Sequence, residues 1–168
     1  MPVVRAYVAL GSNLGDRLEQ MQSALERLSA DDALKVLQVS PVYENRAVGM
    51  GEVDDFLNAM AEVATSLTPL ELLDRCLDVE SQLGRIRTGK WAPRTIDLDV
   101  IAYGQVEMES ERLRLPHPRI AERDFVVHPL NAIAPELQIR GRRVADLAAT
   151  VSLDELTLSN QKLSVRIL

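Results

Sequence analysis

The chain has little that could cross-link it, hold it in a membrane or attract nucleic acid. Its single cysteine, Cys76, cannot form a disulfide within the chain, which is typical of a reducing compartment. Aromatic residues make up 4% of the chain, and the net charge of −6 offers no basic field to a nucleic-acid backbone. No apolar run approaches the length of a transmembrane helix. We therefore expect a cytoplasmic protein whose partners include neither nucleic acid nor membranes.

The length and composition are those of an ordinary globular protein. The chain has 168 residues, of which 46% are hydrophobic and 26% charged. This length predicts one domain over residues 1–168, large enough to fold without disulfide or metal staples. Within it, residues 151–168 have no clear pattern and are expected to be a C-terminal extension without assigned structure.

Hydrophobic periodicity predicts six main elements in the order strand, helix, strand, strand, helix, strand. They are expected at residues 3–10, 16–28, 34–43, 56–64, 68–83 and 96–103. The second helix has the clearest start, with Thr68 as N-cap, Pro69 at the first helical position and Glu71 completing a capping box. Gly84 is expected to end it. This order is typical of a ferredoxin-like βαββαβ core in an α+β protein.

Additional elements are expected after this core. The pattern favours an extended segment in RLRLPHP and an irregular or briefly helical segment in AERDFVVHPL. A short helix is predicted over 144–150. The sequence contains neither an internal repeat nor a low-complexity segment.

Two aspartates interrupt the apolar run RTIDLDVIAY, residues 94–103. Side chains alternate along a strand, so Asp97 and Asp99 share a face with Ile101, and their carboxylates lie roughly 6.6–7 Å apart. Adjacent anions repel each other unless a cation lies between them, and Mg²⁺ commonly binds one or two protein carboxylates together with substrate phosphates. The pair therefore indicates either a magnesium site or an exposed strand face with two solvated charges.

A basic segment, GRIRTGKWAPRT, directly precedes the aspartates. It contains Arg85, Arg87, Lys90 and Arg94, and cations next to an acid pair favour a bound metal–polyphosphate. The alternative is a surface loop that forms salt bridges. A P-loop is excluded, because Trp91 occupies the position that requires Ser or Thr and the segment follows a helix instead of a strand.

A few other side chains stand in unexpected places. Asn58 lies in an apolar strand, where its amide either binds the edge of a heterocycle or bonds a neighbouring backbone group. Phe125 suits either the core or stacking on a flat ring. His117, between two prolines, would as a lone histidine more often be structural, and His128 has no identifiable partner. Cys76 falls on the apolar stripe of its helix and is expected in the core.

Several motifs together resemble one known family. The segments are ALGSNLGDR, DDFLNAM, VESQLGRIR, WAPRTIDLDVIAYG and LPHPRIAERDFVVHPL, followed by IAPEL. In this order, over about residues 3 to 140, the chain resembles the 6-hydroxymethyl-7,8-dihydropterin pyrophosphokinases of folate biosynthesis. The resemblance implies a ferredoxin-like α+β enzyme that transfers diphosphate from Mg-ATP to the pterin hydroxymethyl group and releases AMP. Its expected partners are these small molecules, and we expect a monomer.

The resemblance also implies a role for individual residues. Asp97 and Asp99 would hold two Mg²⁺ ions with the ATP phosphates. The implied ATP contacts are Glu80, Arg85, Arg87, Trp91, Arg94, Arg112, His117 and Arg123. The implied pterin contacts are Gly11, Val48, Phe56, Asn58, Trp91, Asp97 and Phe125. The implied catalytic residues are Arg85, Arg87, Arg94, Asp97 and Asp99, with the segment around Arg87–Trp91 closing over the substrates.

The sequence departs from the family pattern at Asn45, Arg46, Ala47, Leu77 and Ala92. These positions concern the pterin lid and the nucleotide pocket, so the exact pterin and the turnover stay open. Two alternatives remain: a paralogue that acts on a modified pterin, and a non-catalytic ferredoxin-like module that binds nucleotide or pterin. The paired aspartates argue against the second, since a module without chemistry would have no need of a metal pair.

Overall fold

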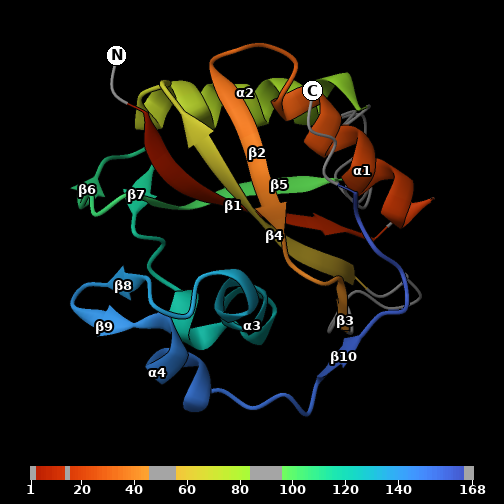
Figure 1. The fold of residues 1–168 in the computed structure, drawn as a ribbon, viewed down its shortest axis with the longest axis vertical. Helices are drawn as coiled ribbons and strands as arrows, with labels where there is room; N and C mark the ends of the chain where they lie inside the picture. The colour runs from red at the N-terminus through yellow and green to blue at the C-terminus, as the bar shows by residue number, and fades with distance from the viewer. Residues whose placement is uncertain (1–2, 14–15, 46–55, 84–95, 165–168) are drawn as a thin grey trace.

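The computed structural model describes residues 3–13, 16–45, 56–83 and 96–164. Its main sheet has six strands (Figure 1). Five of them lie in the order β10-β3-β4-β1-β5, and the sixth, β2, pairs with β4 as β3 does. The strands are β1 Val4–Ser12, β2 Leu34–Val39, β3 Tyr43–Asn45, β4 Phe56–Thr65, β5 Asp97–Tyr103 and β10 Leu156–Leu158. All their pairings are antiparallel. The order β2-β4-β1-β5 confirms the predicted ferredoxin-like core.

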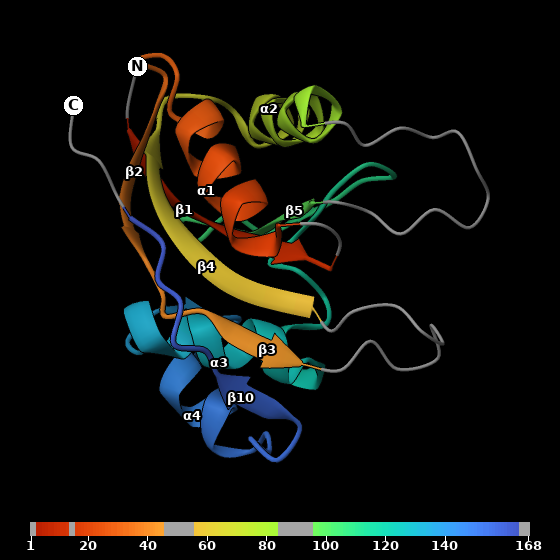
Figure 2. The same cartoon turned by 90° about the vertical axis from the view of Figure 1, so that its right-hand side faces the viewer.

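Helices cover both faces of this sheet (Figure 2). The helices α1 Arg17–Leu28 and α2 Pro69–Gln82 lie on one face. The other face carries α3 Asp124–Ile133 and α4 Val144–Ala149. The smaller elements are a 3₁₀ turn at Ile120–Glu122 and the hairpins β6 Met108–Glu109 with β7 Arg114–Leu115 and β8 Gln138–Ile139 with β9 Arg142–Arg143.

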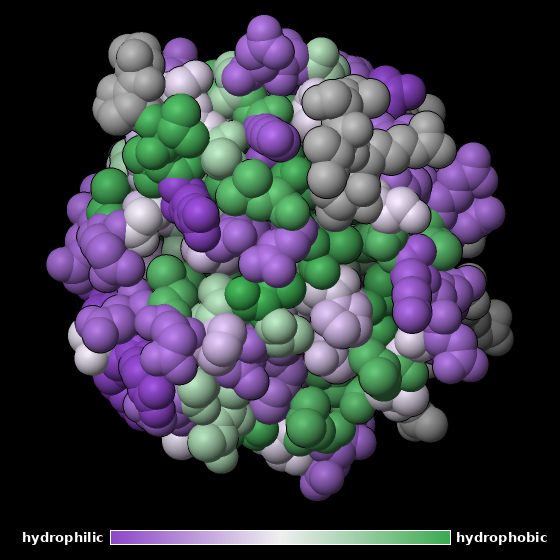
Figure 3. Space-filling view, viewed as in Figure 1, coloured by the Kyte–Doolittle hydropathy of each residue, from purple (hydrophilic) through white to green (hydrophobic). Residues whose placement is uncertain are grey.

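Two hydrophobic clusters follow from this layering. The cluster beneath α1 and α2 contains Cys76, as the helical stripe predicted, and burial raises the pKa of its thiol to about 12. The cluster beneath α3 and α4 contains Met60 and Ile101. Hydrophilic and hydrophobic residues are interspersed on the face shown in Figure 3. None of the helices in the described ranges is long and apolar enough to cross a membrane.

Local chemistry fixes where the two longer helices begin. The Thr68 hydroxyl accepts from the Glu71 N–H at 3.2 Å, and the Glu71 carboxylate accepts from the Thr68 N–H at 2.9 Å, so the predicted capping box is confirmed. Asp16 caps α1 by accepting from the Glu19 N–H at 3.1 Å. Leu83 is the C-cap of α2, and Gly84 lies outside the described residues.

The single strand expected at 34–43 is wrong, because the chain breaks there into β2 and β3. Ser40 still binds β4: its N–H donates to the Met60 carbonyl and its hydroxyl accepts from the Met60 N–H, both at 2.8 Å. The next residue, Pro41, has no N–H to continue a ladder. Both pieces therefore pair with β4, but as separate strands.

The C-terminal part is more regular than the sequence indicates. AERDFVVHPL contains most of a ten-residue helix, α3, with Pro129 inside it. The predicted short helix at 144–150 is confirmed as α4. RLRLPHP contributes only the two-residue strand β7, and the extension contains the three-residue strand β10, which pairs with β3.

A β-bulge in β5 shapes the region next to the aspartates. Tyr7 pairs with Ala102 and Val8 with Val100, so Ile101 is the extra residue. Ile101 and Ala102 both belong to the cluster beneath α3 and α4. The Ile101 carbonyl accepts from the backbone N–H of His117 at 2.8 Å, which fixes His117 beside β5.

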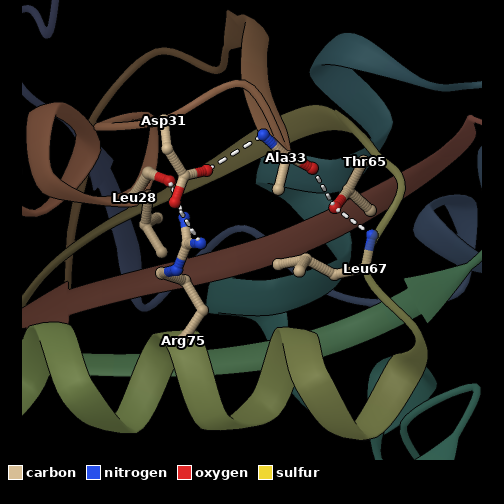
Figure 4. A network of polar contacts seen from close by, with 6 residues as sticks. All are labelled: Leu28, Asp31, Ala33, Thr65, Leu67 and Arg75. Atoms are coloured by element: carbon tan, nitrogen blue, oxygen red, sulfur yellow. Dashed lines mark hydrogen bonds and ion pairs between the residues drawn. The ribbon is translucent and has the colours of Figure 1, made fainter.

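A polar network joins the end of α1 to α2 (Figure 4). Arg75 on α2 donates to the Leu28 carbonyl at 3.0 Å and to the Asp31 carboxylate at 2.7 Å. Asp31 also accepts from the Ala33 N–H at 2.9 Å, and the Ala33 carbonyl accepts from the Thr65 hydroxyl at 2.7 Å. The network therefore ties the α1–β2 turn to both α2 and β4.

Asp31→Asn is expected to destabilise the protein at neutral pH but not in strong acid. The Ala33 N–H, and then Arg75, hold the pKa of Asp31 below its ordinary value of 3.8. The ionised carboxylate therefore stabilises the fold above that value, and its contribution is lost as pH falls through the lower folded pKa. Urea unfolding across a pH series measures this, with Asp32→Asn as the exposed control. If the difference in unfolding free energy between the wild type and Asp31→Asn stays constant into strong acid, the stabilising role of the Asp31 carboxylate is contradicted.

Candidate active site

A cavity of about 650 Å³ lies on the α3 side of the sheet. Three neighbouring strands contribute Ala9 and Gly11 from β1, Phe56 and Asn58 from β4, and Asp97 and Asp99 from β5. The start of α3 adds residues 123–126, the end of β3 adds Asn45, and the turn before β10 adds Glu155. Segments far apart in the sequence thus meet at one hollow.

Strand register aligns three of these positions. Gly11 pairs with Asn58 on one side and with Asp97 on the other, so the three residues form a row across the sheet. Neighbouring strands are about 4.8 Å apart, which puts the Asn58 and Asp97 backbones roughly 10 Å from each other. A Cβ at Gly11 would lie 3.5 Å from the Asn58 side-chain oxygen and 3.9 Å from the Phe56 ring. The missing side chain therefore leaves space above the row for a flat ligand.

Asp97 and Asp99 both line the cavity, as the alternation along the strand predicts. Leu98, which separates the two aspartates, and Val100, which follows them, belong to the cluster beneath α1 and α2 on the opposite face. Asp97 is half-buried and Asp99 exposed. Two carboxylates on an accessible cavity wall are hard oxygen donors that fit Mg²⁺, which also takes water and phosphate oxygens.

Glu80 supports this strand from behind. It lies on α2, is 3% exposed, and accepts a hydrogen bond from the Leu98 N–H at 2.7 Å. Leu98 separates the two aspartates, so this contact fixes the backbone that positions both of them. The contact of Glu80 with ATP that the family resemblance implies stays a prediction.

A second hollow, of about 400 Å³, adjoins the first at Asp99, which lines both. It is also lined by Leu73, Arg112 and His117. Arg112 is exposed and forms an ion pair with Asp74. The polyphosphate-binding candidates Arg112 and His117 thus lie on one side of Asp99, and the aromatic and amide groups lie on the other.

His117 is set up as a neutral hydrogen-bond donor. Burial lowers the pKa of His117, although the Asp99 carboxylate acts in the opposite direction. Its Nδ1 accepts from the Arg119 N–H at 3.1 Å, so in the neutral ring the proton is on Nε2. That N–H can donate to a phosphate oxygen without adding a charge.

The predicted pterin contacts within the described residues share the larger cavity. Gly11, Phe56, Asn58, Asp97 and Phe125 all line it. Arg123, predicted for ATP, lines it as well, and its guanidinium carbon lies 5.8 Å from the centre of the Phe125 ring. Cation and ring therefore form one wall of the cavity.

Asn58 is 5% exposed, and its amide nitrogen donates to the side-chain oxygen of Asn45. This partner is neither of the two that the sequence suggested. The contact holds the amide in one orientation and leaves its oxygen on the Gly11 side. Asn45, noted in the sequence only as a departure from the family pattern, thus belongs to the same cavity.

Some predicted residues lie outside the described part of the chain: Val48, Arg85, Arg87, Trp91 and Arg94. Sequence reasoning also missed three polar lining residues, namely Asn45, Asp124 and Glu155, and three apolar ones, Ala9, Leu10 and Val126. Asp124 had a usable signal, since an acidic residue at the start of an apolar run favours a helix start. Glu155 had none.

The sheet order and the layers define a ferredoxin-like α+β protein, and its larger cavity is lined by two carboxylates of one strand. The model of the 7,8-dihydro-6-hydroxymethylpterin-pyrophosphokinase (HPPK) family matches residues 7–135. The chain therefore belongs to that family.

Named relatives agree with this assignment. The chain is 44% identical over 147 residues to a 2-amino-4-hydroxy-6-hydroxymethyldihydropteridine pyrophosphokinase of Methylorubrum extorquens, covering 88% of this chain and 93% of the relative. It is 43% identical over 133 residues to the enzyme of that name from Bacillus subtilis, covering 79% and 80%. A solved chain described as HPPK-DHPS in complex with substrates matches with a TM-score of 0.71 at 12% identity. That match covers 89% of this chain and 43% of the other, and supports the fold.

Proposed function

We propose that the protein transfers diphosphate from Mg-ATP to the 6-hydroxymethyl group of 6-hydroxymethyl-7,8-dihydropterin, as a step of folate biosynthesis. The pterin hydroxyl oxygen bonds to the β-phosphorus of ATP, the α–β bridging bond breaks, AMP leaves, and the hydroxyl proton is released. The observation that carries the proposal is the meeting of the two hollows at Asp99. One offers ring and amide contacts, and the other offers cationic and N–H donors.

In this proposal Asp97 and Asp99 hold two Mg²⁺ ions together with the ATP phosphates. The ions supply charge neutralisation at the transferring phosphates and an orienting template. The fit rests on the two carboxylates, which are hard donors on one strand face, and on the Glu80 contact that fixes the backbone between them.

The chain's own side chains bind and orient the two substrates. Phe56 and Phe125 offer ring surfaces to the pterin, and Asn58 offers its amide oxygen to the pterin's N–H groups. On the phosphate side, His117 donates from Nε2 and Arg112 supplies positive charge. Positioning and charge complementarity of this kind account for most of the catalysis of phosphoryl transfer, which needs no strong general base. The roles of Arg85, Arg87, Arg94 and Trp91 remain predictions from the sequence.

The decisive assay is AMP release from Mg-ATP with and without 6-hydroxymethyl-7,8-dihydropterin. We expect AMP only when Mg²⁺ and the pterin are both present. A non-catalytic module would bind the ligands without AMP formation, and a paralogue for a modified pterin would bind this pterin without turning it over. Either result would overturn the proposal.

Asn58→Ala is expected to weaken pterin binding far more than Mg-ATP binding. Loss of the amide leaves donors of the bound ring unpaired in a desolvated site, which costs roughly 1–3 kcal/mol, or about 5- to 150-fold in affinity. Calorimetry of each ligand separately measures the two effects, with exposed Asn160→Ala as the control. Equal losses for both ligands would instead indicate that Asn58 is needed only for the structure of the sheet.

A further inference from the structure

The chain returns to the cavity after the region matched by the family model, which ends at residue 135. The segment that follows α4 is held at both ends. At its start, the Val151 carbonyl accepts from Nε2 of the buried His128 on α3 at 2.9 Å. At its end, β10 pairs with β3, and the Ser159 N–H donates to the Val42 carbonyl at 2.8 Å. This C-terminal strap, residues 151–159, runs from beside α4 to the free edge of β3 (Figures 1 and 2).

Glu155 is the residue that the strap brings to the cavity. It stands in a turn closed by a hydrogen bond from the Leu156 N–H to the Leu153 carbonyl at 3.1 Å. Leu156 anchors the turn, because its side chain is buried and its backbone pairs with Asn45. Among the described residues, the Glu155 carboxylate makes no hydrogen bond or ion pair. The anchored turn therefore presents the carboxylate of Glu155 to the cavity as a hydrogen-bond acceptor.

We propose that Glu155 is a specificity-determining residue that accepts hydrogen bonds from the 2-amino end of the bound pterin. This inference rests on the proposed function and adds a residue of the strap to the site.

The ends of the cavity determine the direction of the ligand. The reacting 6-hydroxymethyl group must face Asp97 and Asp99 on β5. Glu155 adjoins β10, beyond β3, and three strand spacings of about 4.8 Å separate β5 from β3, or roughly 14 Å. Positions 2 and 6 are on different rings of a pteridine, so a ligand with position 6 at β5 directs position 2 toward β3 and the strap.

The hydrogen-bond requirement of that end matches a carboxylate. The 2-amino group and the neighbouring ring N–H are donors. Asn58 can supply one acceptor atom, its amide oxygen, because its nitrogen is only a donor and bonds Asn45. An ionised carboxylate offers only acceptors, so Glu155 supplies what the amide pair lacks. The alternative use of Glu155 is to balance the charge of Arg123 across the cavity, and the test separates the two.

Glu155→Gln tests the inference, and Asp154→Asn is the matched control, since Asp154 is an exposed neighbour in the same turn that does not line the cavity. Calorimetry with 6-hydroxymethylpterin, in the presence of a non-hydrolysable Mg-ATP analogue, should show about tenfold weaker binding to Glu155→Gln than to the wild type. Asp154→Asn should bind like the wild type. The pterin KM should rise in Glu155→Gln with little change in kcat, and Mg-ATP affinity should stay within about twofold.

A pterin analogue without the 2-amino group provides the sharpest comparison. Wild type and Glu155→Gln should bind this analogue equally well, because the group that Glu155 recognises is gone. If Glu155→Gln loses the same affinity for the pterin and for the analogue, Glu155 balances the charge of Arg123 and the inference is overturned. Wild-type affinity of Glu155→Gln for the pterin would overturn it as well. AMP release by the wild type tests the proposed function separately, so an active wild type with an unaffected variant rejects only the role of Glu155.

Discussion

Asp97→Asn and Asp99→Asn should each lower AMP formation on the order of a thousandfold, since a bound metal contributes several kcal/mol to charge stabilisation in the transition state. Each substitution would remove a charged side chain from the proposed metal site while relieving repulsion between two neighbouring anions. The variants should therefore fold as well as the wild type. Steady-state AMP release over a range of Mg²⁺ concentrations, together with thermal unfolding, measures both effects.

Asp78→Asn is the control for this experiment, because Asp78 is exposed on α2 and lines neither hollow. It should retain wild-type activity and Mg²⁺ dependence. Near wild-type turnover in either Asp97→Asn or Asp99→Asn at low Mg²⁺ would show that the pair does not bind the metal. The carboxylates would then be solvated charges on the strand, the alternative that the sequence left open.

Glu80→Ala should be the most destabilising of the substitutions considered. It leaves the buried Leu98 N–H without its acceptor and opens a cavity behind β5, which together cost about 2–4 kcal/mol of unfolding free energy. AMP release should fall as well, because the backbone between Asp97 and Asp99 loses its support. Urea unfolding and kinetics on the same preparation measure the two losses.

Glu80→Gln separates support of the strand from direct ATP contact. Its amide oxygen can still accept from Leu98, so a supporting role predicts a smaller loss of stability, about 1 kcal/mol, with an unchanged KM for ATP. A raised KM for ATP with unchanged unfolding free energy would contradict the supporting role. It would favour the ATP contact that the family resemblance implies.

The features that the sequence predicted well are set by neighbours in the chain. The capping box of α2 depends on Thr68 and Glu71, three positions apart, so its chemistry is complete within one helical turn. The common face of Asp97 and Asp99 depends only on the period of two in a strand. Such features hold whatever packs around them.

The features that the sequence predicted poorly depend on contacts between distant segments. The break between β2 and β3 comes at Pro41, which has no N–H for the ladder, directly after Ser40 has bonded Met60, twenty positions away. The helix α3 contains two adjacent valines and Pro129, which all disfavour helix. Its stability comes from burying Val127 and Leu130 against the sheet, which the local sequence does not reveal.

The missed cavity residues have the same origin. Asn45 enters the site because its side chain meets Asn58 across two paired strands. Glu155 enters it because β10, three residues long, forms only by pairing with β3. A strand so short has no periodicity to detect, so its position is a property of the folded chain.

The bulge in β5 is, in effect, one residue more than the sheet requires. If Ile101 were absent, Val100 and Ala102 would be neighbours, and every other side chain of β5 would keep both its partner on β1 and its face. Pairing with β1 therefore does not require the additional residue, although its side chain is buried in the cluster beneath α3 and α4. What it provides is a backbone carbonyl outside the ladder, where the His117 N–H binds. The additional residue therefore fixes the backbone of His117, sixteen positions later, and links the spacing of β5 to the second hollow, which His117 lines.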